Sequence, residues 1–568
     1  MENSEISNIF WEMAELLTLS NENRFKIRAY ERAAQNIEGL SDNLENIYRS
    51  GHLKDIPGIG EGIAKKIIQF IETGKIAEHQ KYLKIFPKET LDMLRIPGIG
   101  PRSAVIFQKK LKIKNIDQLE AAIKAGIIND IPGYGEKKLN NILAGIAQYR
   151  SHQGRFLLDE ASSYADSIIS ALKKIPSIKN ISPAGSLRRM KETIGDIDIL
   201  VISKEYKKIM QVFTNLPQVK RIIAKGHTKS SVVLKNDMNC DLRILEPGTY
   251  GAALHYFTGS RSHNIKIREL GIKKGLKVSE YGIFKKDKVI AGKTETEVYA
   301  AVNLPYIPPE LREDRGELEA ATAHKLPKLV ELHDIIGDLH IHSRYSDGSN
   351  TIAEIAKYAQ ELGYAYIAIT DHSISTRIAG GLDEKKLLAH NREIEKLNLK
   401  IKLLKGVEVD ILPDGSLDYA DNILKTCDVV IAAVHSKFNM DKKSITERII
   451  KAMKNKYVNI LAHPTGRLLN ERSAYEVDLE KILQTAKDTG TFIELNSHPK
   501  RLDLDDIHCK RAKKLGILIS VNTDAHTLDQ LHNMKYGIAT ARRGWLEKKN
   551  ILNTLPFDQL LKKLHQKR

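Results

Sequence analysis

Two aspartates separated by a single isoleucine occupy an alternating stretch in the first half of the chain. Asp196 and Asp198 alternate with Ile197 and Ile199 within the segment 185–200, GSLRRMKETIGDIDIL. On a β-strand such alternate residues point to one face, about 7 Å apart along the chain. Two carboxylates on one face can share divalent cations. An isolated Asp-x-Asp is also typical of a half-exposed strand, so the neighbouring residues decide between the two interpretations.

The residues upstream of these acids are of types that bind phosphate. Gly185 permits close approach of the backbone, and Ser186 offers a hydroxyl. Arg188 and Arg189 add two cations. Next to a pair of carboxylates, this set suits a triphosphate that arrives with Mg²⁺, which favours a functional site over an ordinary strand.

A third carboxylate is expected from a neighbouring strand. The segments 231–234 and 240–245 flank a polar turn at 235–239, which predicts two adjacent strands. Asp241 lies in the second of them. We therefore predict that a catalytic centre binding Mg²⁺ or Mn²⁺ is formed by Asp196, Asp198 and Asp241.

Histidines and carboxylates form an ordered series in the last part of the chain. Beyond Ile335, seven short apolar segments alternate with helical stretches, and residues of metal-ligand type fall at or just beyond the segment ends. This pattern predicts a parallel barrel with its chemistry at the carboxyl ends of the strands. A lone histidine is more often a core or surface residue, but an ordered set favours a metal centre. The series comprises His340, His342, Asp371, His372, Glu408, His435, His463, Glu494, Asp524 and His526.

A short phrase, Ile-Pro-Gly-x-Gly, recurs three times in the first 150 residues, at 56–60, 96–100 and 131–135. Apolar spacing in this region predicts amphipathic helices at 6–19, 25–38, 63–72 and 137–149. One copy of the phrase would fit an ordinary turn. Three copies, each ahead of a helix rich in Lys or Arg, favour contacts from helix N-termini to DNA phosphates, without base specificity. The glycines concerned are Gly58, Gly60, Gly98, Gly100, Gly133 and Gly135.

The composition excludes several classes of protein. A length of 568 residues suggests about four domains at roughly 150 residues each. No apolar run approaches the roughly 20 residues of a membrane span, and the first residues lack the features of a signal peptide, so we expect a cytoplasmic protein. The three cysteines are scattered, which disfavours a disulfide framework and a zinc knuckle.

The net charge of +18 favours a polyanionic partner, although it would also suit a membrane surface or simple solubility. The surplus amounts to +3 for residues 1–150, +10 for residues 151–316 and +5 for the remainder. It is therefore densest around the predicted triphosphate site.

The acids and their upstream residues resemble the nucleotidyltransferase superfamily of DNA polymerase beta. The motif YFTGS at 256–260 narrows the resemblance to the family X DNA polymerases. It implies that Arg189 binds the triphosphate, that YFTGS contacts the nucleotide and its sugar, and that Asn264 and Arg268 contact the minor groove of the nascent pair. Arg261 departs from the polymerase beta branch, which has an acid there. The implied nucleotide-binding set is Gly185, Ser186, Arg189, Tyr256, Phe257, Gly259, Asn264 and Arg268.

The repeated phrase resembles helix-hairpin-helix motifs. In family X proteins the first hairpin holds the DNA downstream of a gap, and the second grips the primer strand. Some members are also lyases, in which a lysine forms a Schiff base with an abasic sugar. Lys66 occupies the nucleophile position and Lys26 matches a phosphate-binding lysine, but Gly62 replaces another cation of the lyase-active branch. Phosphate binding alone is therefore the alternative role for Lys66.

The histidine series resembles the PHP domain, named for polymerase and histidinol phosphatase, over residues 335–568. The resemblance implies up to three bound cations, commonly Mn²⁺, Zn²⁺ or Fe, which imidazole-rich ligation favours over Mg²⁺. It also implies phosphoester hydrolysis, with Arg467 as a phosphate contact near the site. All nine ligand positions are filled, by His340, His342, Asp347, His372, Glu408, His435, His463, Asp524 and His526.

The expected fold is multidomain, of mixed α+β and α/β class. It combines helical N-terminal helix-hairpin-helix domains, a nucleotidyltransferase palm with a mixed sheet, and a C-terminal distorted (β/α)7-type PHP barrel. The expected boundaries are 1–85 for the N-terminal helix-hairpin-helix domain, 86–150 for a second helix-hairpin-helix subdomain, 151–255 for the palm, 256–316 for a nucleotide-selecting subdomain, 317–334 for a linker and 335–568 for the PHP domain.

These features predict a DNA-directed DNA polymerase that fills short gaps in base excision repair and carries a metal-dependent 3′-5′ exonuclease or phosphoesterase. The expected partners are gapped or primer-template DNA and dNTPs, with no membrane, and we expect a monomer associated with the bacterial nucleoid. Two alternatives stay open: a nucleotidyltransferase acting on a non-DNA substrate, and a DNA-binding scaffold with a silent PHP domain. An abasic-site endonuclease or a 3′-phosphatase would also suit the PHP motifs.

Overall fold

The structure is a computed structural model of the chain. It describes residues 3–567 except 39–43, 57, 95, 97–98, 130, 137, 141, 144 and 147–154. The chain divides into two compact units, residues 1–153 and 154–568. Within the described ranges, no helix combines the length and the apolar composition that crossing a membrane requires.

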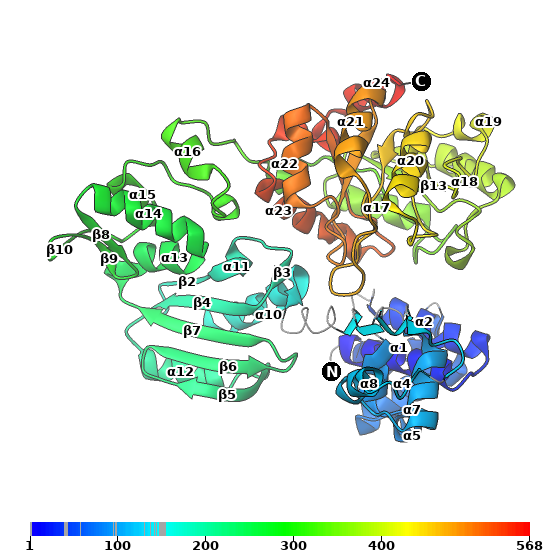
Figure 1. The fold of residues 1–568 in the computed structure, drawn as a ribbon, viewed down its shortest axis with the longest axis horizontal. Coiled ribbons are helices and arrows are strands. Elements are labelled where there is room, and N and C mark those ends of the chain that lie inside the picture. The colour runs from blue at the N-terminus through cyan, green and yellow to red at the C-terminus, as the bar shows by residue number, and fades with distance from the viewer. Residues whose placement is uncertain are drawn as a thin grey trace. The chain divides into compact units, whose positions relative to one another are not determined.

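The described part of the first unit is built from helices alone (Figure 1). They are α1 (Asn3–Leu19), α2 (Arg24–Glu38), α3 (Leu44–Arg49), α4 (Glu61–Thr73), α5 (Ala77–Ile85), α6 (Lys88–Leu94), α7 (Pro101–Leu111) and α8 (Ile116–Lys124), with the short 3-10 helix η1 (Leu53–Asp55). Their apolar faces meet in one core. The helices predicted at 6–19, 25–38 and 63–72 are confirmed, whereas the one at 137–149 falls partly outside the described residues.

Each Ile-Pro-Gly-x-Gly phrase forms the same turn. A hydrogen bond joins its fourth amide to its first carbonyl at 3.0 or 3.1 Å, from Ile59 to Ile56, Ile99 to Ile96 and Tyr134 to Ile131. The fourth residue is buried in every copy, so it anchors the turn in the core. Gly58 and Gly133 have φ of +79° and +86°, where other residues are strained. Gly98, Pro57 and Pro97 lie outside the described residues.

A five-stranded mixed sheet, the palm, opens the second unit in the order β2-β4-β7-β6-β5. Its strands are β2 (Asn180–Pro183), β4 (Asp196–Ile202), β5 (Val219–Lys225), β6 (Lys229–Leu234) and β7 (Asn239–Leu245), and the short strands β1 (Phe156–Leu157) and β3 (Thr193–Ile194) pair with each other. Ile197, Ile199 and Val201 pack in one core with helices α10 (Leu158–Leu172) and α12 (Tyr206–Thr214). Because side chains alternate along β4, Asp196 and Asp198 point to the other face.

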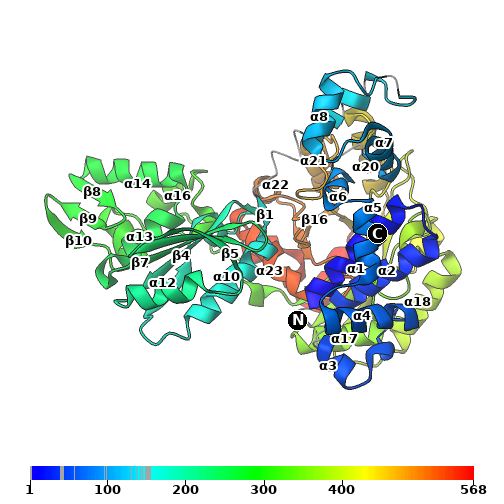
Figure 2. The same cartoon turned by 90° about the horizontal axis from the view of Figure 1, so that it is seen from below.

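The predicted nucleotide-selecting part follows the palm. It contains the helices α13 (Tyr250–Thr258), α14 (Arg261–Lys273) and α15 (Glu295–Ala301) and the antiparallel sheet of β8 (Leu276–Ser279), β9 (Gly282–Lys285) and β10 (Lys288–Ala291). Leu254 of α13 packs against Leu200 of β4, on the face that carries the acids. Figure 2 shows α12 and α13 on opposite sides of the palm sheet.

The segment 317–334, predicted as a linker with some helix, begins with a helix that packs onto this part. Helix α16 (Glu317–Thr322) lies there, and Glu317 is fully buried. Its carboxylate lies 2.7 Å from Nδ1 of His263, which offsets the cost of burying the charge. Leu318 and Ala321 join an apolar cluster with Ile267. Charge content alone therefore does not identify this segment as exposed.

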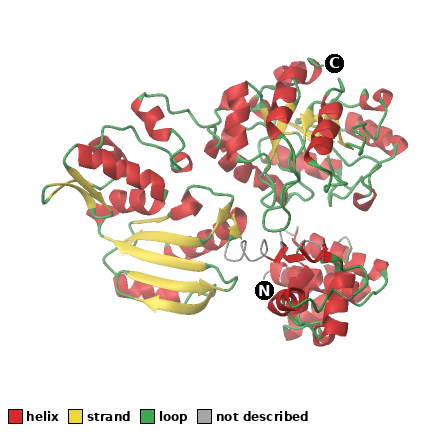
Figure 3. Ribbon diagram, in the orientation of Figure 1, coloured by secondary structure: helices red, strands yellow, loops and turns green. Residues whose placement is uncertain are grey.

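The C-terminal part is the predicted barrel (Figure 3). Seven parallel strands lie in sequence order: β11 (Gly337–Asp338), β12 (Tyr366–Ile369), β13 (Lys402–Asp410), β14 (Val429–Ala433), β15 (Ile460–Leu461), β16 (Phe492–Asn496) and β17 (Ile519–Asn522). The helices are α17 (Ile352–Glu361), α18 (Glu384–Lys396), α19 (Asp421–Leu424), α20 (Lys442–Met453), α21 (Leu479–Thr489), α22 (Asp506–Leu515), α23 (Met534–Arg543) and α24 (Phe557–His565). A bridge between Ile341 and Ala525 nearly closes the sheet.

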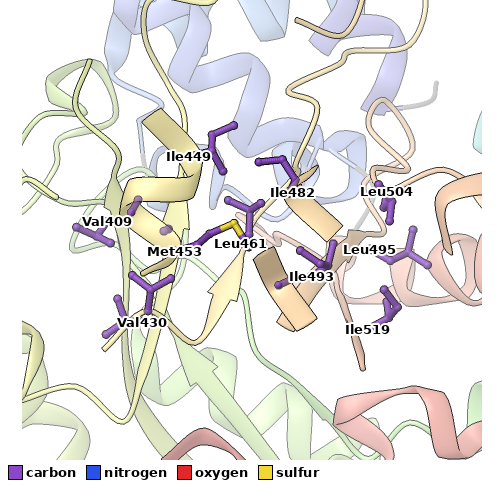
Figure 4. Packing of buried hydrophobic residues seen from close by; sticks show 14 of the residues in the cluster. Val409, Val430, Ile449, Met453, Leu461, Ile482, Ile493, Leu495, Leu504 and Ile519 are labelled. Carbon is purple, nitrogen blue, oxygen red and sulfur yellow. The ribbon is translucent and has the colours of Figure 1, made fainter. Parts of the chain in front are cut away.

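An apolar layer joins the barrel strands to their helices. Figure 4 shows strand residues Val409, Val430, Leu461, Ile493 and Ile519 in one cluster with the helix residues Ile449, Met453 and Ile482. The polar ligand-type residues lie from the middle of their strands onwards and in the loops that follow the strands.

Candidate functional site

The three palm acids come from two adjacent strands. Asp198 on β4 is the register partner of Asp241 on β7, and Asp196 lies two residues earlier on the same face of β4. Asp196 is exposed and the other two are half-buried. The structure thus brings together the three carboxylates that the sequence singles out, on a surface open to solvent.

Gly185 begins the short helix α11 (Gly185–Arg188), which contacts the acids directly. Its φ is +59°, and a Cβ atom built on it would lie 2.9 Å from Oδ2 of Asp198. The preceding amide, of Ala184, donates to the carbonyl of Asp198 at 2.8 Å. Glycine is therefore required both by its backbone conformation and by the close approach to the carboxylate.

The charges around the palm acids are poorly balanced. Burial and repulsion by Asp196 and Asp241 raise the pKa of Asp198 to about 6. Nζ of Lys229 lies 2.6 Å from Oδ2 of Asp241. In the part of the chain that the structure describes, groups of three or more ligand atoms within 4.8 Å of one another occur only in the barrel. Lys229 pairs with only one oxygen of Asp241, so the other oxygen can still bind a cation.

The two arginines after Ser186 are both tied to the nucleotide-selecting part. Arg188 forms a bidentate ion pair with Glu295 at 2.9 and 2.6 Å. Arg189 donates to Glu313 at 2.9 Å and to the carbonyl of Thr258 at 2.6 Å. These contacts fix the direction of both guanidinium groups beside the turn that carries Ser186.

The YFTGS motif ends helix α13 and packs against α14. The side-chain amide nitrogen of Asn264, Nδ2, donates to the carbonyl of Tyr256 at 2.6 Å. Nε of Arg268 donates to the main-chain carbonyl of Asn264 at 3.3 Å. A Cβ on Gly259 would lie 2.3 Å from the Asn264 amide, so glycine is needed there as well. Phe257 lies under the guanidinium of Arg243, 4.5 Å from its centre. Asn264 thus supports the motif in addition to its predicted minor-groove role.

Nine side chains converge at the carboxyl ends of the barrel strands. They include three groups whose ligand atoms all lie within 4.8 Å of one another. The groups are His342, Asp347, His372 and His526; His340, His342 and Asp524; and His372, Glu408 and His435. The ninth residue, His463, joins through Glu408, whose Oε1 lies 3.0 Å from Nε2 of His463. Because the groups share His342 and His372, they form one continuous cluster.

The donor set of this cluster fits bound cations. Nε2 of His340 and Nδ1 of His463 are buried without a hydrogen-bond partner among the described residues. Since buried polar atoms are normally paired, these nitrogens are suited to bind metal. Burial, together with the nearby His526 and His372, lowers the pKa of His342 to about 4. The ring is therefore neutral at pH 7, as metal ligation requires.

Glu494 supports the cluster from behind. Its Oε1 lies 2.7 Å from Nδ1 of His340 and accepts a hydrogen bond from Asn522, while Oε2 accepts from the amide of His463. A carboxylate on one ring nitrogen fixes the tautomer and directs the other nitrogen to the metal. Glu494 is a member of the series but not one of the nine expected ligands, and its role follows from these contacts.

Two arginines of the barrel loops, Arg467 and Arg501, differ in their contacts. Arg467 pairs with Glu192 of the palm at 2.7 Å and donates to the carbonyl of Arg501 at 2.9 Å. Its guanidinium is occupied by these partners, so the expected phosphate contact would require it to exchange one of them. Nε of Arg501 instead lies 3.4 Å from Oδ2 of Asp524. Closeness in sequence to His463 does not determine where a long side chain points.

In the first unit, Lys26 and Lys66 share one carboxylate. Glu78 of α5 lies 2.9 Å from Nζ of Lys26 and 2.8 Å from Nζ of Lys66, and Tyr30 donates to it at 3.0 Å. Although burial raises the pKa of Glu78, hydrogen bonds from the two lysines lower it to about 2. A Schiff base on Lys66 would require this ion pair to break.

Family models match most of the chain. They are a helix-hairpin-helix domain at residues 1–76, a SAM-like helix-hairpin-helix tandem at 90–148, the DNA polymerase beta palm at 155–244, the DNA polymerase beta thumb at 253–313 and the PHP domain at 338–498. The order of the matches is the order of the parts described above.

Curated relatives match either the whole chain or its barrel. The DNA polymerase/3′-5′ exonuclease PolX of Bacillus subtilis (strain 168) is 36% identical over 560 residues, which are 97% of both chains. A probable phosphatase of Thermoanaerobacter sp. (strain X514) is 32% identical over 234 residues, 39% of this chain and 91% of the relative. A probable phosphatase of Caldanaerobacter subterraneus subsp. tengcongensis is 30% identical over 245 residues, which are 41% of this chain and 92% of the relative. The chain therefore belongs to the family X DNA polymerases that carry a C-terminal PHP domain.

Proposed function

We propose that this protein is a DNA-directed DNA polymerase that fills short gaps in base excision repair, and that its barrel acts as a 3′-5′ exonuclease. The observation that carries the polymerase assignment is the pairing of Asp198 with Asp241 across adjacent strands, with Asp196 on the same face. The name of the full-length relative from Bacillus subtilis gives both activities, which supports the same assignment.

The palm residues divide the work of nucleotide addition. Asp196, Asp198 and Asp241 hold Mg²⁺ or Mn²⁺, which when bound polarises the α-phosphate of the dNTP. Ser186 and Arg189 hold the triphosphate. Asp241 also helps to activate the primer 3′-OH for in-line attack on the α-phosphate, and pyrophosphate leaves. The hydrogen bond from the main-chain amide of Ala184 to the carbonyl of Asp198 keeps the backbone of this turn against the acids.

The barrel residues suit hydrolysis at a nucleic-acid end. The nine ligands hold up to three cations of the Mn²⁺, Zn²⁺ or Fe type, because imidazoles dominate the set. Cations held by these residues would lower the pKa of a bound water and bind a phosphate, which is the chemistry of phosphoester hydrolysis. Arg501, beside Asp524, supplies positive charge for the phosphate that is cleaved.

The first unit grips DNA through its hairpins. Their turns present helix N-termini, as at Gly60 before α4 and Gly100 before α7, and such termini bind phosphate without regard to base sequence. The substrates are gapped or primer-template DNA and dNTPs. We propose that the chain acts as a monomer in the cytoplasm, at the nucleoid, where these substrates occur.

Primer extension on a duplex with a one-nucleotide gap tests the central claim. With Mg²⁺ and Mn²⁺ supplied separately, we expect template-directed addition of one nucleotide. A labelled primer without dNTPs should be shortened from its 3′ end when Mn²⁺ is present. Transfer only to RNA ends or small molecules would favour a nucleotidyltransferase with another substrate, and binding without either reaction would favour a scaffold.

A further inference from the structure

Five side chains of alternating charge connect the palm to the barrel within the second unit. We call them the charge chain, and they are Arg189, Glu313, Arg543, Asp506 and Arg315. Nε of Arg189 and Nη1 of Arg543 donate to the same oxygen of Glu313, at 2.9 and 3.0 Å. Nη2 of Arg543 donates to Asp506 at 2.7 Å, and Arg315 donates to Asp506 at 2.9 Å. Arg543 ends α23 and Asp506 begins α22, so the barrel supplies two members of the charge chain.

Arg543 also contacts Arg189 itself. Its Nη1 donates to the main-chain carbonyl of Arg189 at 2.9 Å. The contact is shielded from water, because the side chains of Arg189 and Glu313 are each 11% exposed and that of Arg543 is 5% exposed. The barrel therefore holds the main chain of Arg189 directly and its guanidinium through Glu313.

Further contacts fix the same region to the barrel. Tyr536 and Ala539 of α23 belong to the apolar core of the palm. Arg467 of the barrel pairs at 2.7 Å with Glu192, three residues after Arg189. The segment that carries Arg189 is thus bound to the barrel through its main chain and through a second ion pair.

The electrostatics of Glu313 depend on Arg543. Burial raises the pKa of Glu313, but the charges of Arg189 and Arg543 lower it below its ordinary value, so the group is a carboxylate. If Glu313 paired with Arg189 alone, the pair would be neutral. With Arg543 present, the charge chain has three cations, Arg189, Arg543 and Arg315, against the two carboxylates of Glu313 and Asp506, so it keeps a net positive charge. A triphosphate requires such a charge of the arginine that binds it.

We propose that Arg543 of the barrel is a positioning residue of the polymerase nucleotide site: it holds Arg189 in place and offsets Glu313, so that Arg189 is available to the triphosphate. This inference rests on the proposed function, in which Arg189 binds the incoming dNTP. The PHP domain then contributes to nucleotide addition through α23, independently of its own metal ligands.

The test compares gap filling by two full-length variants, each altered at one of the two arginines that end α23. Arg543→Gln should raise the KM for dNTP by about tenfold, the size of one charge-assisted contact, with a smaller change in kcat. Arg542→Gln is the matched control, because Arg542 pairs with Glu310 and Glu331 instead. Its KM should stay near that of the wild type. Equal rises in both variants, or no rise in Arg543→Gln, would overturn the proposal.

A double variant tests the electrostatic part and guards against a folding defect. Glu313→Gln added to Arg543→Gln removes the carboxylate that would otherwise neutralise Arg189, so the KM should fall back towards that of the wild type. A thermal melt of each variant accompanies the kinetics. If the double variant melts like the wild type and keeps the high KM, Arg543 does not act by offsetting Glu313, and the proposal is wrong.

Arg189→Gln separates this inference from the proposed function. A raised KM in Arg189→Gln together with a normal KM in Arg543→Gln overturns the role of Arg543 alone. A normal KM in Arg189→Gln removes the nucleotide-binding role of Arg189, and the inference falls with it. Raised values in both variants, with recovery in the double variant, support both statements.

Discussion

Asp198 and Asp241 are register partners on the adjacent parallel strands β4 and β7, so their side chains lie side by side on one face of the sheet. Burial and repulsion by the neighbouring acids Asp196 and Asp241 raise the pKa of Asp198 to about 6. Lys229 compensates one oxygen of Asp241. Because these carboxylates repel one another, a divalent cation bound among them would be stabilising, as we propose for this site.

The first prediction concerns these acids. Asp196→Asn or Asp241→Asn should lower the rate of nucleotide addition by about a thousandfold or more, because a metal ligand and its charge are lost. Binding of gapped DNA should change little, since we propose that the hairpins of the first unit, and not the acids, hold the duplex. Primer extension and a gel-shift titration of the same samples measure the two effects. Retained polymerisation by either variant would remove the catalytic role of the palm acids.

The second prediction concerns the hairpin glycines. A Cβ on Gly60 or Gly100 would meet no atom within 4 Å, and both residues have ordinary negative φ. Alanine at these positions should therefore leave the melting temperature nearly unchanged. It should still weaken DNA binding by about tenfold, because the methyl group occupies the space through which a phosphate approaches the helix N-terminus. Unchanged affinity in both variants would mean that phosphate does not approach there.

Gly133 provides the contrasting case. Its surroundings are equally open, but its φ of +86° strains any other residue. Gly133→Ala should therefore lower the free energy of unfolding by about 1 kcal/mol, in addition to any effect on binding. A melting temperature equal to that of the Gly60→Ala variant would contradict the backbone argument.

The third prediction is a steep salt dependence. If the hairpins and nearby lysines make about six phosphate contacts, affinity for gapped duplex should fall about a thousandfold between 50 and 200 mM salt. A plot of log affinity against log salt should be linear, with a shallower slope for the Gly60→Ala variant. A flat plot for the wild type would show that phosphate contacts are not the main grip on DNA.

Local patterns in the sequence predicted the elements that carry the sites. Alternation around Asp196 placed it with Asp198 on one face of a strand, and the apolar segment before Asp241 predicted the neighbouring strand. The ligand-type residues of the barrel were found because parallel strands bring their carboxyl ends to one side of the sheet. In each case, the period of the secondary structure determines the direction of the side chain.

Contacts between distant segments were not predictable in this way. Arg467 stands four residues after His463, yet its guanidinium pairs with Glu192 of the palm. Glu317 belongs to a charged segment, yet it is buried against His263. Both outcomes depend on which partner meets a side chain in the folded chain. Spacing along the sequence does not encode that information.

The fourth prediction concerns Lys66. Because its amine is paired with Glu78, wild-type protein incubated with incised abasic DNA should give no adduct after borohydride reduction. Glu78→Gln releases the amine and should produce an adduct, which a further Lys66→Ala change removes. An adduct with the wild type that disappears in Lys66→Ala would instead identify Lys66 as a lyase nucleophile.

Glu78 should also affect the stability of the first unit. Its pKa is lowered to about 2 from an ordinary value of 4.5, so its stabilising contribution is complete above that ordinary value and is lost as the pH falls towards 2. The difference in melting temperature between the wild type and Glu78→Gln should accordingly be larger at pH 7 than at pH 3. A difference that grows on acidification would have the wrong sign.

The last prediction is that the two catalytic centres can be inactivated separately. The palm centre consists of three carboxylates, which are hard ligands suited to Mg²⁺, whereas imidazoles dominate the barrel cluster and retain softer cations. The predicted ligands His340 and His342 lie at the carboxyl ends of barrel strands and are not members of the charge chain that reaches Arg189. Loss of the barrel metals should therefore leave the nucleotide site unaffected.

His340→Ala combined with His342→Ala should abolish shortening of a labelled 3′ end in Mn²⁺, while gap filling continues in Mg²⁺. Asp241→Asn should do the reverse, stopping synthesis and leaving hydrolysis measurable. A metal analysis of the double histidine variant should show loss of bound Mn²⁺ or Zn²⁺. The alternative is that the barrel ligands serve only the fold, in which case the double variant should lose thermal stability and both activities together. Loss of hydrolysis at an unchanged melting temperature distinguishes catalysis from that structural role, because removing two ligands from a purely structural metal would unfold the barrel to which the palm is joined through α23.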